Sequence, residues 1–471
     1  MILVILIDLL LVATLLYKSS QKGVENALPA FAFFTVLLPE NCMIPIPGVF
    51  GLSAQRLAVI VLLICFFLFR RKPESTASSS STPLLVLIFL QLGWSLLSTA
   101  NSIVPLMSFK KLFSVILEYY AVYFIFFKVI SNTETIRRIV TAMVAAMAIT
   151  TVPGAIESYT GWSVTSWFPA LGLRFDLGLD QARGIRTQST FQHSILYGGA
   201  LAMILPLTFY LIATANSKLK RILLWLSVFL MFLCLYKTSS RGPWIAAMLG
   251  FVLVFFYTLR PIKKYMFAII VLCALVMVVR PGVYDTIAGF YDETVSPDNP
   301  MASSYQYRYS LRDVSVKAIS KSTATELWGY GMESFYYLHL EGPFMGKEGH
   351  LFESCDSAWI EAMVETGFVG LGIFFLLLAS AAVRGVRSLP SLPKPDRYLQ
   401  WILVVNMLQY YFLMLSVAIY GWGQNGFMLW ITIAVSLAYP RVLPKAEASS
   451  VEVAAATPSL YPARSLVSNR S

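Results

Sequence analysis

A short polar segment, Lys237-Thr-Ser-Ser-Arg241-Gly-Pro, immediately precedes the apolar run Pro243–Leu259. A helix that begins here leaves its first backbone N–H groups unpaired, so Arg241 and the two preceding serines would form an anion site at the helix N-terminus. A guanidinium can bind a phosphate through two parallel hydrogen bonds. The alternative is an interfacial arginine whose head group reaches the lipid headgroups. Position alone does not separate these two interpretations.

A second polar segment, Arg183–His193, ends at an apolar run that begins near Ser194. This segment would bring Arg183, Arg186 and His193 to one edge of the membrane. Four aromatic residues lie upstream: Tyr159, Trp162, Trp167 and Phe168. An aromatic belt at the membrane interface explains all four. Stacking on sugar rings is the alternative.

A third segment, Tyr307–Asp313, carries Arg308 and Arg312. The residues that follow, Val314–Ile319, are amphipathic and predict a helix. The glycine pair of Gly329-Tyr-Gly331 then predicts a turn.

Three carboxylates lie at the start of the apolar run Ser357–Val383: Asp356, Glu361 and Glu365. Carboxylates are favourable at any helix N-terminus, which is sufficient to explain the first two. Glu365 would lie inside the edge of the bilayer, where a carboxylate is costly and therefore indicates a function.

The composition shows which elements must hold these residues. Of the 471 residues, 57% are hydrophobic and only 13% are charged, whereas soluble domains carry about 25% charged residues. Disorder requires the opposite composition. The net charge of +11 does not indicate nucleic-acid binding, because the basic residues form short clusters between apolar runs. We therefore expect an all-α polytopic membrane protein.

Twelve apolar runs are candidate membrane spans. They are Ile2–Tyr17, Arg56–Phe69, Pro83–Leu97, Leu112–Ile130, Ile136–Ile156, Ser194–Ala213, Ile222–Tyr236, Pro243–Leu259, Tyr265–Val279, Ser357–Val383, Tyr398–Ala418 and Gly426–Tyr439. A further run, Leu28–Leu38, is either a short span or a re-entrant segment. We expect 12 or 13 helices in the membrane.

Basic clusters alternate along the chain and predict its orientation, because cytoplasmic loops are enriched in Lys and Arg. The predicted cytoplasmic residues are Arg70, Arg71, Lys72, Arg137, Arg138, Lys218, Lys220, Arg221, Arg260, Lys263, Lys264, Arg384, Arg387, Lys394, Arg397, Arg441 and Lys445. Lys110 and Lys111 fall on the opposite side and violate the rule. Lys18 and Lys22 also violate it, unless Leu28–Leu38 is a true span.

Two large loops then lie on the outer, non-cytoplasmic side of the membrane. The second, Pro281–Cys355, holds five Lys/Arg and ten Asp/Glu, and this acidic balance supports an outer location. We divide the chain into N-terminal helices (1–155), a first outer loop (156–193), central helices (194–280), a large outer loop (281–355), C-terminal helices (356–441) and a disordered cytoplasmic tail (442–471). The segment Lys72–Pro83 is a Ser/Thr-rich linker.

Four motifs, taken in order, resemble the O-antigen ligase and polymerase superfamily of bacterial envelopes. They are Arg186…Thr190-Phe-Gln-His193…Gly198, Ser240-Arg241-Gly242, Arg308…Gly329-Tyr-Gly331 and Glu365-Thr-Gly367-Phe-Val-Gly370-Leu. The resemblance covers roughly Arg186–Leu371. It implies a fold similar to GT-C glycosyltransferases, with a large, partly helical periplasmic loop.

The resemblance also implies a reaction. Members of this superfamily transfer a glycan from an undecaprenyl diphosphate carrier to an acceptor hydroxyl on the outer face of the membrane, without a metal or other cofactor. By motif, Arg241 and Arg308 would engage the diphosphate, with Arg312 as the substitute for the second. Fixed cations are suited to the charge that develops on such a leaving group. The remaining candidate substrate-binding residues are Arg186, His193, His350 and Glu365.

One departure from the family pattern concerns the acceptor. Many ligases carry His-Asn where this chain has Asp356-Ser357, and the histidine is thought to act on the acceptor hydroxyl. A carboxylate can also accept that proton, and His350 and His339 are other candidates. The departure favours a repeat-unit polymerase over a lipid A-core ligase. A transporter or flippase for lipid-linked sugars and a non-catalytic scaffold are the alternatives from other classes.

The expected partners follow from this reading. They are an undecaprenyl-diphosphate-linked glycan, membrane lipids, and a chain-length regulator or flippase, with no nucleic acid. The expected location is the bacterial inner membrane.

Overall fold

The computed structural model describes residues 1–44, 51–69, 82–168, 179–180, 184–257, 263–268, 271, 303–421 and 423–442. Several predicted features lie wholly or largely outside these residues: Arg183, the linker Lys72–Pro83, most of the span Tyr265–Val279, the first part of the large loop and the C-terminal tail. Within the described residues the chain is helical, with three two-stranded antiparallel hairpins.

The first half of the chain forms seven α-helices and a π-helical turn. They are α1 (Ile2–Lys22), α2 (Leu28–Leu37), α3 (Ala54–Phe69), α4 (Leu85–Ala100), α5 (Pro105–Val115), η2 (Ile116–Tyr120), α6 (Ala121–Val129) and α7 (Thr133–Thr160). The second half adds α8 (Ser194–Thr214), α9 (Lys218–Lys237), α10 (Arg241–Phe256), α13 (Ser303–Ile319), α14 (Thr323–Trp328), α15 (Ala358–Arg387), α16 (Asp396–Leu413) and α17 (Gly423–Val442). The hairpins are β1–β2 (Met43–Ile44, Leu52–Ser53), β3–β4 (Leu179–Asp180, Gly184–Ile185) and β5–β6 (Glu341–Phe344, Lys347–Leu351).

The length and composition of the helices confirm a multi-pass membrane protein. Among the described residues, six helical stretches are long and apolar enough to cross a bilayer: Ile2–Lys22, Pro105–Val129, Thr133–Thr160, Ser194–Thr214, Lys218–Lys237 and Ala358–Ser391. Four shorter apolar stretches accompany them. The full count of 12 or 13 spans stays a prediction.

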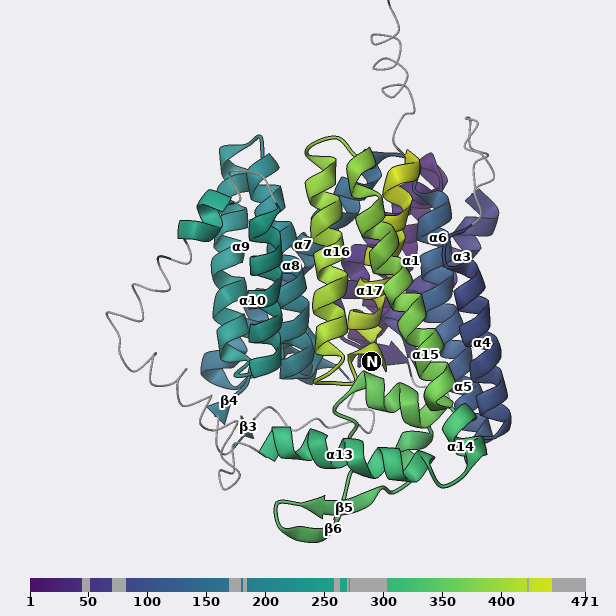
Figure 1. The fold of residues 1–471 in the computed structure, drawn as a ribbon. Helices are drawn as coiled ribbons and strands as arrows, with labels where there is room; N and C mark the ends of the chain where they lie inside the picture. Colours follow the sequence, from purple (N-terminus) through teal and green to yellow (C-terminus); the bar gives the residue numbers. More distant parts are fainter. Residues whose placement is uncertain are drawn as a thin grey trace, which may run out of the picture.

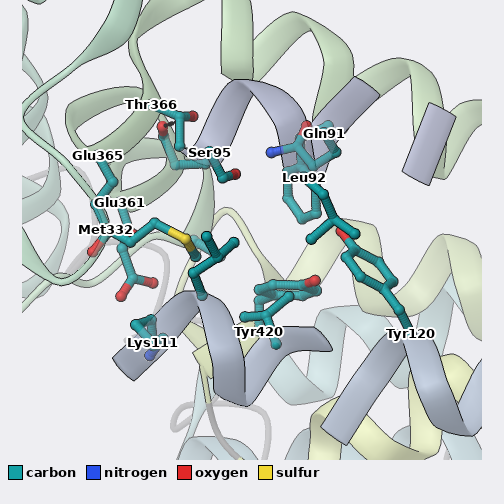
Figure 2. A pocket seen from close by; sticks show the side chains of 15 residues that line it. Gln91, Leu92, Ser95, Lys111, Tyr120, Met332, Glu361, Glu365, Thr366 and Tyr420 are labelled. Atoms are coloured by element: carbon teal, nitrogen blue, oxygen red, sulfur yellow. Dashed lines mark hydrogen bonds between the residues drawn. The ribbon is translucent and has the colours of Figure 1, made fainter. Parts of the chain in front are cut away.

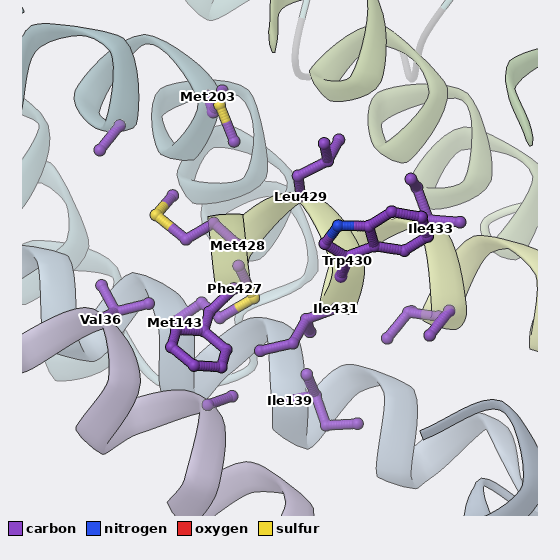
Figure 3. Close-up of a cluster of buried hydrophobic side chains, with 14 of the residues drawn as sticks. Val36, Ile139, Met143, Met203, Phe427, Met428, Leu429, Trp430, Ile431 and Ile433 are labelled. Atoms are coloured by element: carbon purple, nitrogen blue, oxygen red, sulfur yellow. The ribbon is translucent and has the colours of Figure 1, made fainter. Parts of the chain in front are cut away.

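The helices differ in how much of their surface they bury. The most apolar window of α8 is 94% buried, whereas those of α1 and α9 are 28% and 22% buried. A helix that is apolar all round belongs in the core, and one with an exposed apolar face belongs at the lipid boundary. Helix α17 is also central: Phe427, Met428 and Trp430 pack among Val36, Ile139 and Met203 (Figure 3).

Two predicted boundaries shift for physical reasons. Helix α7 continues past Ile156 to Thr160, because Gly161 supplies the left-handed cap that ends it (φ 72°). Helix α5 begins at Pro105 rather than at Leu112, so Lys110 and Lys111 lie on a helix rather than in a loop.

One end of the bundle gathers the basic residues that were predicted to share a side. Arg137 pairs with Asp396 at 2.9 Å, and the Tyr439 hydroxyl donates to the same carboxylate at 2.9 Å. Arg441 donates to the backbone oxygen of Ile130 at 2.7 Å. Residues from three distant parts of the sequence therefore meet at this end, where α17 also ends (Figure 1).

The last residues of α1, which include Lys18 and Lys22, lie at the same end of the bundle. Arg138 donates to the Asn26 side chain at 2.9 Å, and Asn26 in turn donates to the backbone oxygen of Lys18 at 3.2 Å. The run Leu28–Leu38 therefore leads away from this end as helix α2. Lys18 and Lys22 lie with the other basic residues and no longer violate the charge rule.

The opposite end carries α13, α14 and the β5–β6 hairpin, which lie across the ends of the other helices (Figure 1). Helix α13 confirms the amphipathic helix predicted around Val314–Ile319. The glycine pair forms the predicted turn, with φ values of 73° at Gly329 and 95° at Gly331.

Two glycines allow this turn to pack against a kink in α15. A β-carbon on Gly329 would lie 2.5 Å from the carbonyl of Glu365, and one on Gly367 would collide with the backbone of Leu327. Gly367 has φ 70°, which breaks α15 at that residue. The Gly-x-Gly motif and the Glu-Thr-Gly motif are thus two halves of one contact.

The sidedness of the two ends is open to a direct test. A periplasm-active reporter fused near Glu326 should be active, because the acidic loop end is predicted to face outward. A fusion near Lys394, at the basic end, should be inactive with the same reporter and active with a cytoplasmic one. The reverse pattern would contradict the orientation, and equal activity at both positions would contradict the alternation.

Candidate functional site

The segment before α10 lies against Arg186. Ser240 is the residue that precedes the helix, and its hydroxyl donates to the backbone oxygen of Thr238 at 2.9 Å. Arg186 donates through Nε to the same oxygen at 3.1 Å and through Nη2 to the Ser240 hydroxyl at 2.7 Å. The first two arginine motifs are therefore brought together, and Arg241 begins a helix as predicted.

Small residues allow this contact to be close. A β-carbon on Gly198 of α8 would lie 2.7 Å from the β-carbon of Pro243 and 3.2 Å from the Thr238 hydroxyl. Gly198 belongs to the first motif and Pro243 follows the second. Helices α8 and α10 thus pack tightly at the end where the arginines lie.

His193 lies just before α8, on the same side. Burial and the nearby Arg186 lower the pKa of His193 to about 4. The imidazole is therefore neutral at physiological pH. It can hydrogen-bond to a ligand, but it does not add a third positive charge to those of Arg186 and Arg241.

The turn after α16, residues 414–417, contacts both α10 and the start of α15. A β-carbon on Gly242 would lie 2.9 Å from the Ser416 hydroxyl oxygen. From the other side, the Ala358 N–H donates to the backbone oxygen of Met414 at 2.9 Å, and the Ser357 hydroxyl donates to the same oxygen at 3.1 Å. The Ser-Arg-Gly motif and the entry to α15 therefore flank one turn.

Arg308 meets Asp356 at this entry. Its Nη2 lies 3.3 Å from Asp356 Oδ2. The Tyr307 hydroxyl donates to the backbone oxygen of Ser354 at 2.9 Å, and the Ser354 hydroxyl donates to Asp356 at 3.3 Å. Helix α13 is thus attached to the start of α15 through two neighbouring residues.

Two features of Asp356 suit it to proton transfer. Burial raises the pKa of its carboxyl, against the opposing effects of Arg308 and the Ser354 hydrogen bond. The N-cap of α15 is Ser357, whose hydroxyl accepts from the Ile360 N–H at 3.5 Å. Asp356 is therefore not the cap, and the favourable charge of a carboxylate near a helix N-terminus is the structural explanation that is left for it.

Two candidates have other surroundings. Arg312 pairs with its neighbour Asp313 at 3.1 Å and lies over the ring of Tyr309 at 4.9 Å. His350 lies on β6 among aromatic rings, with ring centroids 4.6 Å from Phe344 and 5.2 Å from Phe352. Charge pairing and packing are sufficient to explain these two residues, so Arg308 is the better candidate on α13.

Glu365 belongs to a separate group of charges beside the entry to α15. Its Oε1 accepts the backbone N–H of Glu333 at 2.6 Å, and the Glu333 carboxylate pairs with Lys111 at 3.1 Å. Glu361 lines the same cavity as Lys111 and Glu365. No function was predicted for Lys111 or Glu333 from the sequence. Lys111 could have been noticed because it violates the rule that lysines are enriched on the cytoplasmic side.

The site thus has two groups of arginines, Arg186 with Arg241 at the start of α10 and Arg308 at the entry to α15, and a group of acidic residues around Glu361 and Glu365. No group of three or more His, Cys, Asp or Glu residues in the described part of the chain is placed to hold a metal ion. Guanidinium groups of this kind can bind an anion such as a phosphate or diphosphate. Asp356, two residues before the first residue of α15, can accept a proton.

The comparisons with known proteins agree with the motifs. Residues 226–375, about a third of the chain, match a family model described as O-antigen ligase. The match supports the O-antigen ligase/polymerase superfamily that the sequence predicted, and with it an activity of the ligase or polymerase type. It spans Arg241, Arg308, Asp356 and Glu365 but not Arg186 or His193. None of the curated proteins compared with the chain matches it.

Proposed function

We propose that this chain is a glycosyltransferase of the bacterial inner membrane that polymerises a polysaccharide from repeat units carried on undecaprenyl diphosphate. The observation that supports this most directly is the arrangement around the turn 414–417. Gly242, beside Arg241, packs on one side of that turn, and the entry to α15, where Arg308 meets Asp356, is bonded to the other. A transporter would be expected to place its ionisable groups near the middle of the membrane.

The arginines would bind the diphosphate of the donor. When the bond between the sugar C1 and the phosphate oxygen breaks, negative charge grows on the leaving diphosphate. Arg241 and Arg308 can stabilise that charge through fixed guanidinium groups, which remain charged at any working pH. Arg186 holds the backbone before α10 and would position Arg241 rather than replace it.

Asp356 would act on the acceptor. The acceptor hydroxyl oxygen forms the new bond to C1 of the donor sugar, and its proton passes to the Asp356 carboxylate. A raised pKa makes the carboxylate a better base near neutral pH. The ion pair with Arg308 fixes the carboxylate beside the group that would hold the leaving diphosphate.

A ligase that transfers glycan to a lipid or protein acceptor is the second candidate, because the matching family model carries that description. Polymerisation is preferred since Asp356-Ser357 stands where many ligases carry His-Asn. The two activities differ in the product that accumulates when the gene is deleted. A polymerase mutant would leave single repeat units on the lipid carrier, whereas a ligase mutant would leave full-length polymer there.

Complementation of the deletion strain tests the role of Arg241. The wild-type gene should restore polymer, and Arg241→Ala should not, because the leaving diphosphate loses a fixed cation. Arg312→Ala, which removes an arginine already paired with Asp313, should restore polymer and serves as the control. Glycans would be measured by gel after confirming equal amounts of protein in the membrane. Polymer of normal length from Arg241→Ala would refute the assignment.

The pair Asp356→Asn and Ser357→Ala separates catalysis from helix capping. Asp356→Asn should reduce the transfer rate by roughly 10²- to 10⁴-fold if the carboxylate accepts the proton. Ser357→Ala should instead lower the free energy of unfolding by about 1 kcal/mol, through loss of the cap. Thermal unfolding and initial rates would be measured on both proteins. A near-normal rate for Asp356→Asn would mean that Asp356 has a structural role and does not accept the proton.

The pH profile adds an independent check on Asp356. The carboxylate must be ionised to accept a proton, so activity should fall as the pH drops through its raised pKa. Ser354→Ala removes a hydrogen bond that lowers this pKa, so the acidic limb should move to higher pH. An unchanged limb would mean that another group controls it.

A further inference from the structure

Residues 329–333, which directly follow α14 and are named the strap below, are bonded to the corner between α4 and α5. Three residues of α5 and this corner donate hydrogen bonds of 2.5 to 3.3 Å to backbone oxygens of the strap: Asn101 to Gly329, Ile103 to Tyr330 and Ser108 to Met332. A β-carbon on Gly331 would lie 2.3 Å from the Ser102 side chain. The strap therefore lies directly on the corner.

The other side of the strap is bonded to α15, just before its kink. The N–H groups of Tyr330 and Gly331 donate to the backbone oxygens of Val364 and Glu365, both at 3.0 Å. The corner helix α4 also reaches α15 directly, because the Ser98 hydroxyl donates to the Glu365 backbone oxygen at 2.5 Å. The strap thus joins two parts of the membrane bundle that are distant in the sequence.

Glu333 ends the strap in a left-handed conformation, with φ 64°, which is uncommon for a residue that has a side chain. Two contacts hold it there: its N–H donates to Glu365 Oε1 at 2.6 Å, and its carboxylate pairs with Lys111 of α5 at 3.1 Å. Figure 2 shows Lys111 on the wall of a cavity that Met332, Glu361 and Glu365 also line. Lys111 is therefore the cation that fixes the end of the strap.

Helix α13, which carries Arg308, packs on the strap and on the residues that follow it. The Tyr330 hydroxyl donates to the backbone oxygen of Ala318, near the end of α13, at 2.7 Å. Phe335, two residues beyond the strap, belongs to the same buried cluster as Leu311 of α13. Leu311 is three residues from Arg308 on this helix. Because a helix transmits displacement as a rigid element, the strap helps to determine where Arg308 lies.

We propose that Lys111 is a positioning residue, which holds the strap through Glu333 and so places Arg308 beside the diphosphate of the donor. This inference rests on the proposed function, because it needs Arg308 to bind that diphosphate. The corner and Lys111 lie outside residues 226–375, which the family model matches. The N-terminal helices therefore supply a support for the site that the matched region does not contain.

The test measures binding of undecaprenyl diphosphate to the full-length protein in lipid nanodiscs. Lys111→Met should raise the Kd about 3- to 30-fold, because a displaced Arg308 contacts the diphosphate less well. Lys111→Arg keeps a cation beside Glu333 and should remain within about twofold of the wild-type Kd. Lys317→Met makes the same change at an exposed lysine of α13 and should leave the Kd unchanged.

A double variant shows whether Lys111 acts through Arg308. Arg308→Ala removes the group that Lys111 would position, so adding Lys111→Met to it should raise the Kd no further. A lysine that only stabilises the fold would lower the melting temperature in both backgrounds and change the Kd by the same factor in each. Glu333→Gln breaks the same ion pair without removing the lysine, and it replaces Lys111→Met in these measurements if that variant does not fold.

The possible results are distinguishable. If the wild-type protein does not bind undecaprenyl diphosphate saturably, the proposed function itself fails. If the wild type binds but Lys111→Met and Glu333→Gln leave the Kd unchanged, or raise it equally with and without Arg308, only the positioning role is refuted. A Kd that rises only when Arg308 is present, and that Lys111→Arg restores, is the result expected.

Discussion

The start of α15 is the point on which the arrangement of the site depends. Its first backbone N–H and its N-cap hydroxyl both donate to Met414 in the turn after α16. This turn also receives Gly242, so the position of α15 determines where Arg241 lies relative to Asp356. Arg308 joins them from a helix outside the bundle, through an ion pair of 3.3 Å. A displacement of this one helix end would therefore separate three motifs that lie far apart in the sequence.

Two groups of ionisable side chains lie around the same helix end. The first group consists of Arg186 before α8, Arg241 at the start of α10, and Arg308 of α13, which pairs with Asp356. In the second group, Glu361 and Glu365 line a cavity together with Lys111. Lys111 is also the residue that broke the charge rule in the sequence, and its pairing with Glu333 explains why a lysine is retained at this end.

Composition was sufficient to predict an all-α protein with several membrane spans, because lipid imposes long apolar runs on the helices that cross it. The amphipathic helix before the Gly-x-Gly turn was also predictable from its pattern. The contacts of the site were not. That Gly329 packs on the kink at Gly367, or that Ser357 rather than Asp356 caps α15, depends on tertiary packing between segments that no local pattern connects. Lys111 shows the intermediate case: its position was anomalous in the sequence, but its partners were visible only in the fold.

The central claim is that Arg241 and Arg308 hold the diphosphate of a lipid carrier, and binding of undecaprenyl diphosphate to the protein in nanodiscs tests it without the need for an acceptor. Native mass spectrometry would count the bound lipid for the wild type, Arg241→Ala, Arg308→Ala and the control Arg312→Ala. The account predicts one bound diphosphate lipid in the wild type and in Arg312→Ala, and loss of this lipid in the other two variants. Equal retention in all four proteins would contradict it.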